Sequence, residues 1–320
     1  MLDRKIFIHG GAEKCGSSAI QFFLSQNRHT LAKFGFFVPD ANFGVNDDLV
    51  TGNHVFFLQN IIVLRSAGDF ISRLDAIFDF IPVGHSILIS AENLFSTDAG
   101  FLFEILSKHY DVNFLAYIRR QDDYLISAWK QWYFRVEEDV YSWLITAPVR
   151  LGRWDVIAGS FGDILPDENF NLKVYDRAEF TSQNIVINYI EYLGLGEHLP
   201  DFVIEASSIN TSLDVFTVDL LKSNFYIQVG VHDNTLIDRL LQDFPFNNRY
   251  SPISFVARQK IEDLFSFGNE KVCGRFFPNR ERLFRQVKFD DYLYATKSES
   301  EAQQLKILAA MVFNLYAQRS

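Results

Sequence analysis

Cysteine, basic residues and long apolar runs are all scarce in this sequence, and each shortage excludes a class of protein. Two cysteines among 320 residues are too few for a disulfide framework or for a zinc site built from cysteines. The chain carries 30 Lys and Arg against 40 Asp and Glu, a net charge of −10, whereas general nucleic-acid binders usually have a basic excess. The longest late apolar run, residues 307–313, is far too short to span a bilayer.

What the sequence does have is enough apolar side chains for a large hydrophobic core. Hydrophobic residues make up 48% of the chain and phenylalanine alone accounts for 33 residues, which excludes an intrinsically disordered protein. No repeat, low-complexity segment or linker divides the chain, so we expect a single domain over residues 1–320. The first residues lack the apolar segment and cleavage site of a secretory signal. We therefore expect a cytoplasmic protein without a transmembrane segment, and we leave peripheral contact with a membrane surface open.

Short apolar runs alternate with helical patterns over about the first 180 residues. The runs are continuously apolar, which favours a parallel sheet covered on both faces. They predict strands at residues 5–9, 86–90, 113–118 and 172–175. Helical spacing predicts helices from residue 17 to the glycine at 35, and at 122–135, 183–193, 213–224, 253–267 and 298–318. The expected architecture is an α/β core over about residues 1–180 and a helical cover over about residues 181–320.

The loop between the first strand and the first helix contains the parts of an anion site. It runs from Gly10 to Gly16 and is followed directly by Ser17 and Ser18. Backbone N–H groups at a helix N-terminus lack partners and carry partial positive charge, so this position favours a phosphate group. Lys14 adds a full positive charge, and the two serines add hydroxyl donors. The alternative interpretation is an ordinary strand–helix turn with a capped helix and a solvated lysine.

The familiar glycine-rich phosphate motifs do not fit this loop. A Walker A loop places its lysine directly after a glycine, whereas Lys14 precedes Gly16 by two positions. The dinucleotide fingerprint also fails, because the glycines stand at 10, 11 and 16. Cys15 would be a nucleophilic thiolate in a phosphatase-type loop, but that loop needs an arginine where Gln21 stands. We therefore interpret Cys15 as a structural residue of the loop.

An arginine pair, Arg119 and Arg120, follows the strand at 113–118, and Asp122 and Asp123 come directly afterwards. Two interpretations remain open for this segment taken alone. A guanidinium group can bind phosphate through paired hydrogen bonds, or the two arginines can form ion pairs with the two aspartates.

The stretch from His9 to Gln21 resembles the 5′-phosphosulfate loop of sulfotransferases that use 3′-phosphoadenosine 5′-phosphosulfate (PAPS), in particular the bacterial carbohydrate-type members. That family typically reads Pro-Lys-Thr/Ser-Gly-Thr-Thr. At these positions the present chain has Glu13, Lys14, Cys15, Gly16, Ser17 and Ser18. His9 and Gln21 also stand at spacings from the lysine that bacterial members often show. The resemblance implies a P-loop-like three-layer fold, with a central, mainly parallel sheet flanked by helices.

The resemblance extends to a second segment. Sulfotransferases hold the 3′-phosphate with an arginine at a strand end and a serine eight residues later, a spacing that Arg119 and Ser127 match, with Arg120 as the alternative. Tyr175, after the strand at 172–175, is similar to the tyrosine that the family places near the adenine. The cofactor-binding residues that the resemblance implies are Lys14, Cys15, Gly16, Ser17, Ser18, Arg119, Ser127 and Tyr175.

The activity that this resemblance implies is in-line transfer of a sulfuryl group from PAPS to a hydroxyl group of a carbohydrate or glycolipid, with release of PAP. Lys14 would stabilise charge on the leaving phosphate. A general base is also needed, for which His54 is the first candidate and Glu92 the second. No residue spacing suggests a metal site. Two alternatives stay open: a nucleotide kinase of similar architecture in which Glu92 helps to hold Mg²⁺, and a non-catalytic relative that binds a glycan.

Overall fold

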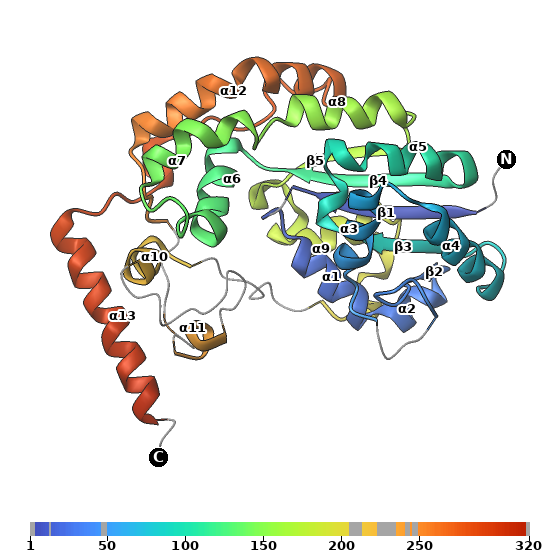
Figure 1. Ribbon diagram of the computed structural model, residues 1–320, viewed down its shortest axis with the longest axis horizontal. Helices are drawn as coiled ribbons and strands as arrows, with labels where there is room; N and C mark the ends of the chain where they lie inside the picture. Colours follow the sequence, from blue (N-terminus) through green and yellow to red (C-terminus); the bar gives the residue numbers. More distant parts are fainter. Residues whose placement is uncertain are drawn as a thin grey trace. The chain divides into compact units, whose positions relative to one another are not determined.

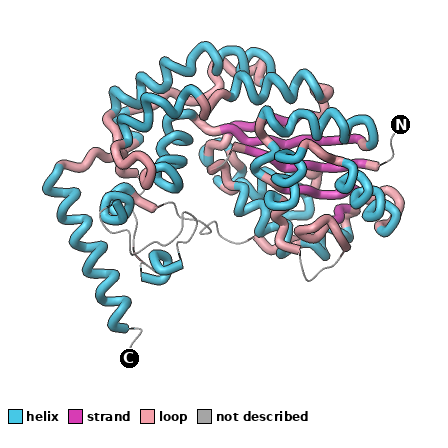
Figure 2. Tube along the Cα trace, viewed as in Figure 1, coloured by secondary structure: helices cyan, strands magenta, loops and turns pink. Residues whose placement is uncertain are grey.

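The structure is a computed structural model that describes residues 4–12, 14–45, 50–204, 213–222, 235–240, 244 and 249–317. Glu13 and the C-terminal ends of the helices expected at 213–224 and 298–318 lie outside the described residues. Figure 1 shows the order of the elements along the chain, and Figure 2 shows a sheet with helices on both sides.

The described residues form one five-stranded sheet in the order β2-β3-β1-β4-β5, and all four strand pairs are parallel. Its strands are β1 (Lys5–Gly11), β2 (Phe36–Phe37), β3 (Ser86–Ser90), β4 (Asp111–Ile118) and β5 (Phe170–Val174). This arrangement confirms the α/β class and the parallel sheet expected from the continuously apolar runs. The short strand β2 carries too weak a pattern to be found from the sequence.

Both faces of the sheet are covered by aromatic and aliphatic side chains. On one face the ring of His9 lies 5.8 Å from the ring of Tyr189 in α9 (Ile185–Tyr192). On the other face the ring of Phe114 lies 4.5 Å from Phe103 in α5 (Gly100–His109) and 4.9 Å from Phe161 in α8 (Trp154–Ile164). Because water is excluded from both faces, the strands carry apolar residues at successive positions.

The remaining helices account for most of the chain. They are α1 (Ser17–Gln26), α2 (Arg28–Lys33), α3 (Val55–Leu64), α4 (Gly68–Phe80), α6 (Gln121–Ala128), α7 (Val140–Thr146), α10 (Val215–Lys222), α11 (Thr235–Leu240), α12 (Phe255–Phe276) and α13 (Lys297–Ala317). A π-helical turn, η4 (Trp129–Tyr133), follows α6 directly.

Three expected helices differ from the structure. The one expected at 253–267 continues to Phe276 as α12. The helix predicted to run from residue 17 to Gly35 is interrupted at Asn27, whose side-chain amide donates to the carbonyl oxygens of Phe23 at 3.0 Å and Val203 at 2.9 Å. An asparagine side chain that competes for backbone groups in this way ends a helix, which the apolar spacing alone does not reveal. The helix expected at 122–135 is regular only to Ala128, where the π-helical turn begins.

The chain divides into two compact units. The first unit consists of Met1–Arg120, Trp154–Asn210 and Gly268–Phe284 and contains the sheet. The second unit consists of Gln121–Arg153, Thr211–Phe267 and Arg285–Ser320 and contains helices such as α6, α7, α10 and α13. Each unit thus combines segments that are far apart in the sequence.

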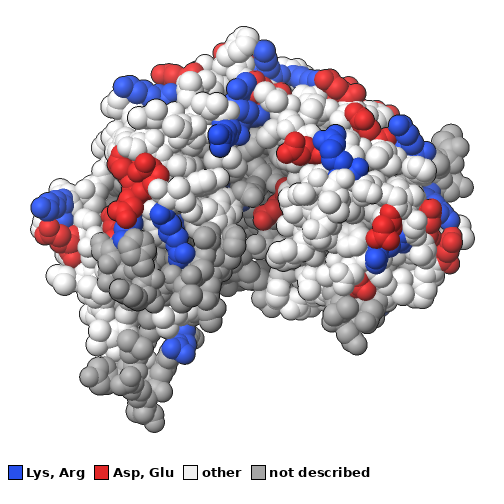
Figure 3. Space-filling view, viewed as in Figure 1, with Lys and Arg blue, Asp and Glu red and all other residues white. Residues whose placement is uncertain are grey.

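Charged side chains of both signs are interspersed on the face seen in Figure 3, where the described Lys and Arg residues form no continuous track. Among the described helices, none combines the length and the apolar character needed to cross a bilayer.

Candidate functional site

The loop from β1 to α1 turns sharply through two residues with left-handed backbone conformation. Lys14 has φ 67° and Gly16 has φ 82°. The N–H of Cys15 donates to the carbonyl oxygen of Ala12 at 3.2 Å, which closes the turn. A left-handed lysine is unusual, and strain of this kind is concentrated at functional sites because the surrounding structure must hold it in place. The loop therefore has a defined shape that presents Lys14 beside the start of α1.

Gly16 is required by its backbone conformation and by its neighbours. A methyl group at this position would lie 2.8 Å from Cδ1 of Ile185 and 3.0 Å from Cε2 of Tyr175. Gly16 is also the N-cap residue of α1, so the helix begins without a side-chain cap, and no acidic residue stands in its first turn. The N-terminal N–H groups of α1 and the positive end of its dipole are therefore available for an anion.

Three buried polar atoms on the elements that flank this loop have no hydrogen-bond partner within the described part of the chain. They are Oγ of Ser17, Nε2 of Gln21 and Nε2 of His9. The three residues are 4%, 8% and 1% exposed, so bulk water does not compensate them. Leaving such atoms unpaired is unfavourable, and native structures rarely do so without a ligand or an ordered water. Of the three, Oγ of Ser17 belongs to the first residue of α1, where a hydroxyl can donate to an anionic oxygen.

Arg119 and Tyr175 follow the carboxyl ends of β4 and β5 and lie against the same loop. Nη1 of Arg119 donates to the carbonyl oxygen of Lys14 at 3.3 Å, and the guanidinium carbon lies 5.7 Å from the centre of the Tyr175 ring. Tyr175 in turn packs beside Gly16. We name this group, Lys14, Gly16, Ser17, Arg119 and Tyr175, the β1–α1 cradle. The structure thus brings together five of the residues expected from the sequence.

The position of the cradle follows from the order of the strands. After β1 the chain builds β2 and β3 on one side of it and then β4 and β5 on the other. In open α/β sheets, ligands bind outside the carboxyl ends of the strands at the place where the strand order reverses. The β1–α1 loop occupies that place. Cys15 in the same loop is 1% exposed.

Glu92 lies after β3, at the start of the short helical turn Glu92–Leu94, and is partly exposed. The neighbouring Asn93 ties this turn to the first turn of α3, because its amide nitrogen donates to the carbonyl oxygen of Val55 at 3.2 Å and to Oε1 of Gln59 at 2.9 Å. The N–H of Ala91 donates to the carbonyl oxygen of His9 at 2.9 Å, so Glu92 follows a strand end anchored to β1. These contacts fix the backbone on both sides of Glu92 after the carboxyl end of β3.

His54, the other expected base, is buried and engaged by the backbone. Its side chain is 1% exposed, Nδ1 accepts from the N–H of Ser90 at 3.2 Å, and Nε2 lies 3.3 Å from the carbonyl oxygen of Pro39, to which it donates. Burial lowers the pKa of His54 to about 4, which keeps the imidazole neutral near pH 7. Both ring nitrogens are therefore occupied within the fold.

Ser90 links His54 to a second buried histidine that the sequence pattern marked only by its spacing. Nδ1 of His9 lies 2.8 Å from Oγ of Ser90, its register partner on the neighbouring strand. Burial lowers the pKa of His9 to about 3. The only signal for this contact in the sequence is that both residues end apolar runs, and pairing the runs correctly requires the sheet order.

Two expected residues remain. Ser18, the second residue of α1, is exposed. Ser127 is 7% exposed and belongs to α6 in the second unit, whereas Arg119 belongs to the first. Among the described residues, no group of three or more His, Cys, Asp or Glu side chains is arranged to hold a metal ion.

Comparisons with known proteins add little to this site. No protein-family model and no curated protein matches the chain. Among solved structures, it is similar to the crystal structure of a sulfotransferase from Alicyclobacillus acidocaldarius, at 14% sequence identity and a TM-score of 0.49. That likeness covers 85% of this chain and 96% of the other. The function is therefore inferred from the residues of the chain itself.

Proposed function

We propose that this protein is a PAPS-dependent sulfotransferase, which transfers the sulfuryl group to a hydroxyl group of a carbohydrate or glycolipid and releases PAP. The observation that carries the proposal is the β1–α1 cradle. Its sequence resembles the phosphosulfate loop of that family, and its residues present a lysine, an uncapped helix N-terminus and an unpartnered buried hydroxyl at one place. Those are the groups that a phosphosulfate requires.

The proposed binding roles follow the positions of the residues. Lys14, Ser17, Ser18 and the N–H groups at the start of α1 bind the 5′-phosphosulfate. Arg119 binds the 3′-phosphate, which is supported by its hydrogen bond to the Lys14 carbonyl oxygen beside the loop. Ser127 is assigned to the same phosphate because it stands eight residues after Arg119 in the sequence. Tyr175, which packs at Gly16, provides an aromatic surface for the adenine.

In the proposed reaction the acceptor hydroxyl oxygen attacks the sulfur atom, and the bond from sulfur to the bridging phosphate oxygen breaks. Negative charge passes to that phosphate oxygen, where Lys14 and the N–H groups of α1 stabilise it. The hydroxyl proton passes to a carboxylate or imidazole base, and the products are a sulfate ester and PAP. No step consumes an oxidant or a reductant.

We propose Glu92 as the base in preference to His54. Glu92 is partly exposed, whereas both ring nitrogens of His54 contact the backbone and its pKa is lowered to about 4. A base must reach the proton that it removes, and an imidazole enclosed in this way cannot do so without leaving its partners. His54 is instead proposed to hold the end of β3, and with it the segment that carries Glu92.

Ligand binding tests the proposal directly. A ligand that binds only the folded state raises the free energy of unfolding by about 2.7 kcal/mol at a concentration 100 times its Kd. We expect PAP to raise the melting temperature well above the effect of AMP, which lacks the 3′-phosphate, and Mg·ATP to have little effect. A larger shift with Mg·ATP than with PAP would favour the kinase, and no shift with PAP would favour a non-catalytic glycan-binding protein.

Turnover with PAPS and a panel of glycans and glycolipids then tests the assignment of the base. We expect Glu92→Gln to lower the rate about a hundredfold or more while PAP still binds, because proton transfer contributes roughly 10²–10⁴ to a rate. The acid limb of the pH–rate profile should disappear in this variant. His54→Gln should keep that limb, and its loss there would assign the base to His54.

A further inference from the structure

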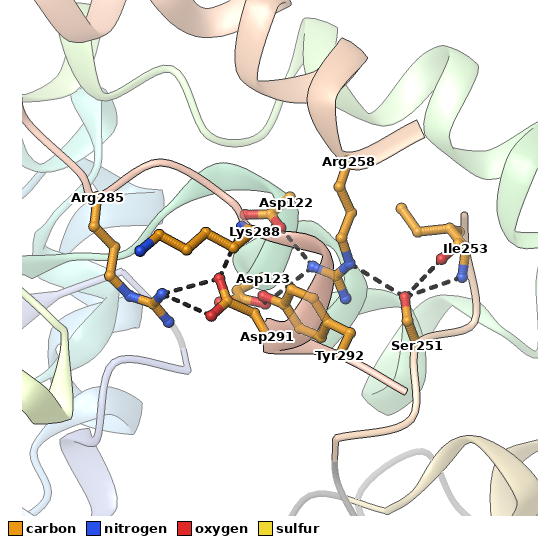
Figure 4. A network of polar contacts seen from close by, with 9 residues as sticks. All are labelled: Asp122, Asp123, Ser251, Ile253, Arg258, Arg285, Lys288, Asp291 and Tyr292. Carbon is orange, nitrogen blue, oxygen red and sulfur yellow. Dashed lines mark hydrogen bonds and ion pairs between the residues drawn. The ribbon is translucent and has the colours of Figure 1, made fainter. Parts of the chain in front are cut away.

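The second unit contains a buried arginine, Arg258 of α12, that binds two carboxylates of one helix (Figure 4). The side chain of Arg258 is 2% exposed. Its Nη1 lies 2.5 Å from Oδ2 of Asp122 and 3.1 Å from Oδ1 of Asp123, the second and third residues of α6. The sequence left the partners of these aspartates open, and in the structure both contact this distant arginine.

Two further groups hold the guanidinium in place. Its carbon atom lies 3.4 Å from the centre of the Tyr292 ring, and the Tyr292 hydroxyl donates to Oδ1 of Asp123 at 2.6 Å. Nε of Arg258 donates to Oγ of Ser251 at 3.1 Å. We name these residues, Arg258, Asp122, Asp123, Ser251 and Tyr292, the Arg258 cluster. Arg258 and Tyr292 each lie more than a hundred positions from α6 in the sequence, and both contact its first turn.

Such a cluster is better suited to fixing geometry than to adding stability. Desolvation offsets much of the attraction in a buried ion pair, whereas a planar guanidinium whose Nη1 is shared by two carboxylates and which lies against a ring defines an orientation. The helix that receives these contacts is short: α6 has eight residues and passes directly into the π-helical turn η4. Seven of its eight residues are buried, and the cluster adds directional polar contacts at its first turn.

Asp123 and Ser127 stand four positions apart on α6 and therefore lie on the same face, one turn from each other. Fixing the Asp123 carboxylate from two sides consequently fixes the direction in which Ser127 is presented. We propose that Arg258 is a positioning residue for 3′-phosphate recognition, acting through Asp123 and the first turn of α6 on Ser127. This inference rests on the proposed function, in which Ser127 contacts that phosphate.

The test compares the Kd values for PAP and AMP, which differ in the 3′-phosphate, in Arg258→Gln, Tyr292→Phe and Ser127→Ala. Tyr292→Phe keeps the ring beside Arg258 and removes the hydroxyl that donates to Asp123. We expect Arg258→Gln to weaken PAP about tenfold, the usual effect of one hydrogen bond to a charged group, and to leave AMP unchanged. Tyr292→Phe should raise the ratio of the PAP Kd to the AMP Kd as well, by about threefold.

The decisive measurement is the double variant. If Arg258 acts through Ser127, Arg258→Gln adds no further loss of PAP affinity in the Ser127→Ala background. Arg258→Lys should retain part of the preference for PAP over AMP that Arg258→Gln loses, because lysine keeps the charge without the planar guanidinium. Arg73→Gln is the matched control: Arg73 also pairs with an aspartate, at 2.8 Å, and lies 5.2 Å from a phenylalanine ring, but it is 41% exposed in the first unit.

The outcomes separate this inference from the proposed function. A wild-type protein that binds PAP no more tightly than AMP overturns both. A wild-type preference for PAP that survives in Arg258→Gln or Tyr292→Phe, an equal loss of PAP and AMP affinity, or additive losses with Ser127→Ala overturns the positioning role alone. Where Arg258→Gln does not fold, Tyr292→Phe and its double variant with Ser127→Ala decide the question.

Discussion

The β1–α1 cradle and the Arg258 cluster both gather charged and polar side chains in buried positions, but they satisfy them in opposite ways. In the Arg258 cluster the guanidinium contacts two carboxylates, a hydroxyl and a ring, all from the protein. Oγ of Ser17 in the cradle, and the buried side-chain Nε2 atoms of Gln21 and His9 on the flanking α1 and β1, have no partner among the described residues.

We expect this difference to distinguish a structural network from a proposed binding site. Buried polar groups that are satisfied within the protein contribute to a unique fold, and removing one of them leaves its partner unpaired. Polar groups that the fold leaves unpaired reduce stability until a ligand arrives. Substitutions should therefore differ in their effect on the stability of the ligand-free protein: in the cluster they should lower it, and in the cradle they should lower binding or turnover without lowering stability.

The largest effect on stability is expected in the Arg258 cluster. Arg258→Met leaves the carboxylate of Asp122, which is 1% exposed, buried without its cation, and breaking such a pair lowers the free energy of unfolding by about 3–5 kcal/mol. Urea denaturation measures this loss. Arg73→Met, at an exposed ion pair, should change stability by less than about 1 kcal/mol. Adding Asp122→Asn to Arg258→Met should restore part of the loss; a fully stable single variant would contradict the structural reading of the cluster.

The largest effect on turnover is expected in the cradle. Lys14→Ala should lower kcat by about 10²–10³, the usual loss when one group that stabilises transition-state charge is removed, and should weaken PAP binding. Its stability should stay close to that of the wild type, because Lys14 is partly exposed. The exposed Lys33 on α2 offers the control, and Lys33→Ala should leave kcat unchanged. Unchanged kinetics in Lys14→Ala would reject the assignment of the cradle.

The two buried histidines, His54 and His9, should make the stability of the protein depend on pH. A histidine whose pKa is lowered on folding binds protons more weakly in the folded state, so stability is lost as the pH falls from about 6.5. For His54 the loss extends to about pH 4 and amounts to about 3 kcal/mol, at up to about 1.4 kcal/mol per pH unit. His9 adds a loss that continues to about pH 3. Denaturation of His54→Gln should show a shallower pH dependence between 6.5 and 4, and an unchanged slope would contradict the buried neutral state.

The smallest expected effect is on the stability of the ligand-free protein, and its direction separates the two regions. Ser17→Ala removes a buried hydroxyl that has no partner in the described part of the chain, so the ligand-free protein should become more stable by about 1 kcal/mol. The same substitution should weaken PAP binding by about tenfold. Calorimetric melting with and without PAP measures both. Ser18 is exposed, and Ser18→Ala should leave the ligand-free stability unchanged. A destabilised Ser17→Ala variant would indicate that the Ser17 hydroxyl is satisfied within the protein, as in a structural network.

The fold could be predicted from the sequence where local pattern and tertiary structure agree. Strand β3 was expected at its observed residues, and β1, β4 and β5 within a few residues of their ends. The two-residue strand β2 and the interruption at Asn27 could not be found, because both depend on contacts with distant segments. The division into two units also depends on long-range packing, since each unit draws on three separate stretches of the chain.

The candidate site shows the same limit. The lysine, the glycine and the serines of the loop lie within five consecutive positions of the sequence, so an anion site could be proposed from the sequence. The burial of His54 was not, because its partners come from Pro39 and Ser90. The partner of Asp122 could likewise not be predicted from the sequence, since Arg258 lies 136 positions away.

By itself, the sequence determined the class of the fold and the β1–α1 loop, because apolar periodicity and a strand–turn–helix segment act over short distances along the chain. Only the tertiary structure decided which polar groups are satisfied. The scarcity of cysteine and of basic charge excluded whole classes of protein, but it could not show that one arginine would be buried between two carboxylates. Nor could it show that a serine would be buried without a partner. Both depend on which segments the sheet order and the helix packing bring together.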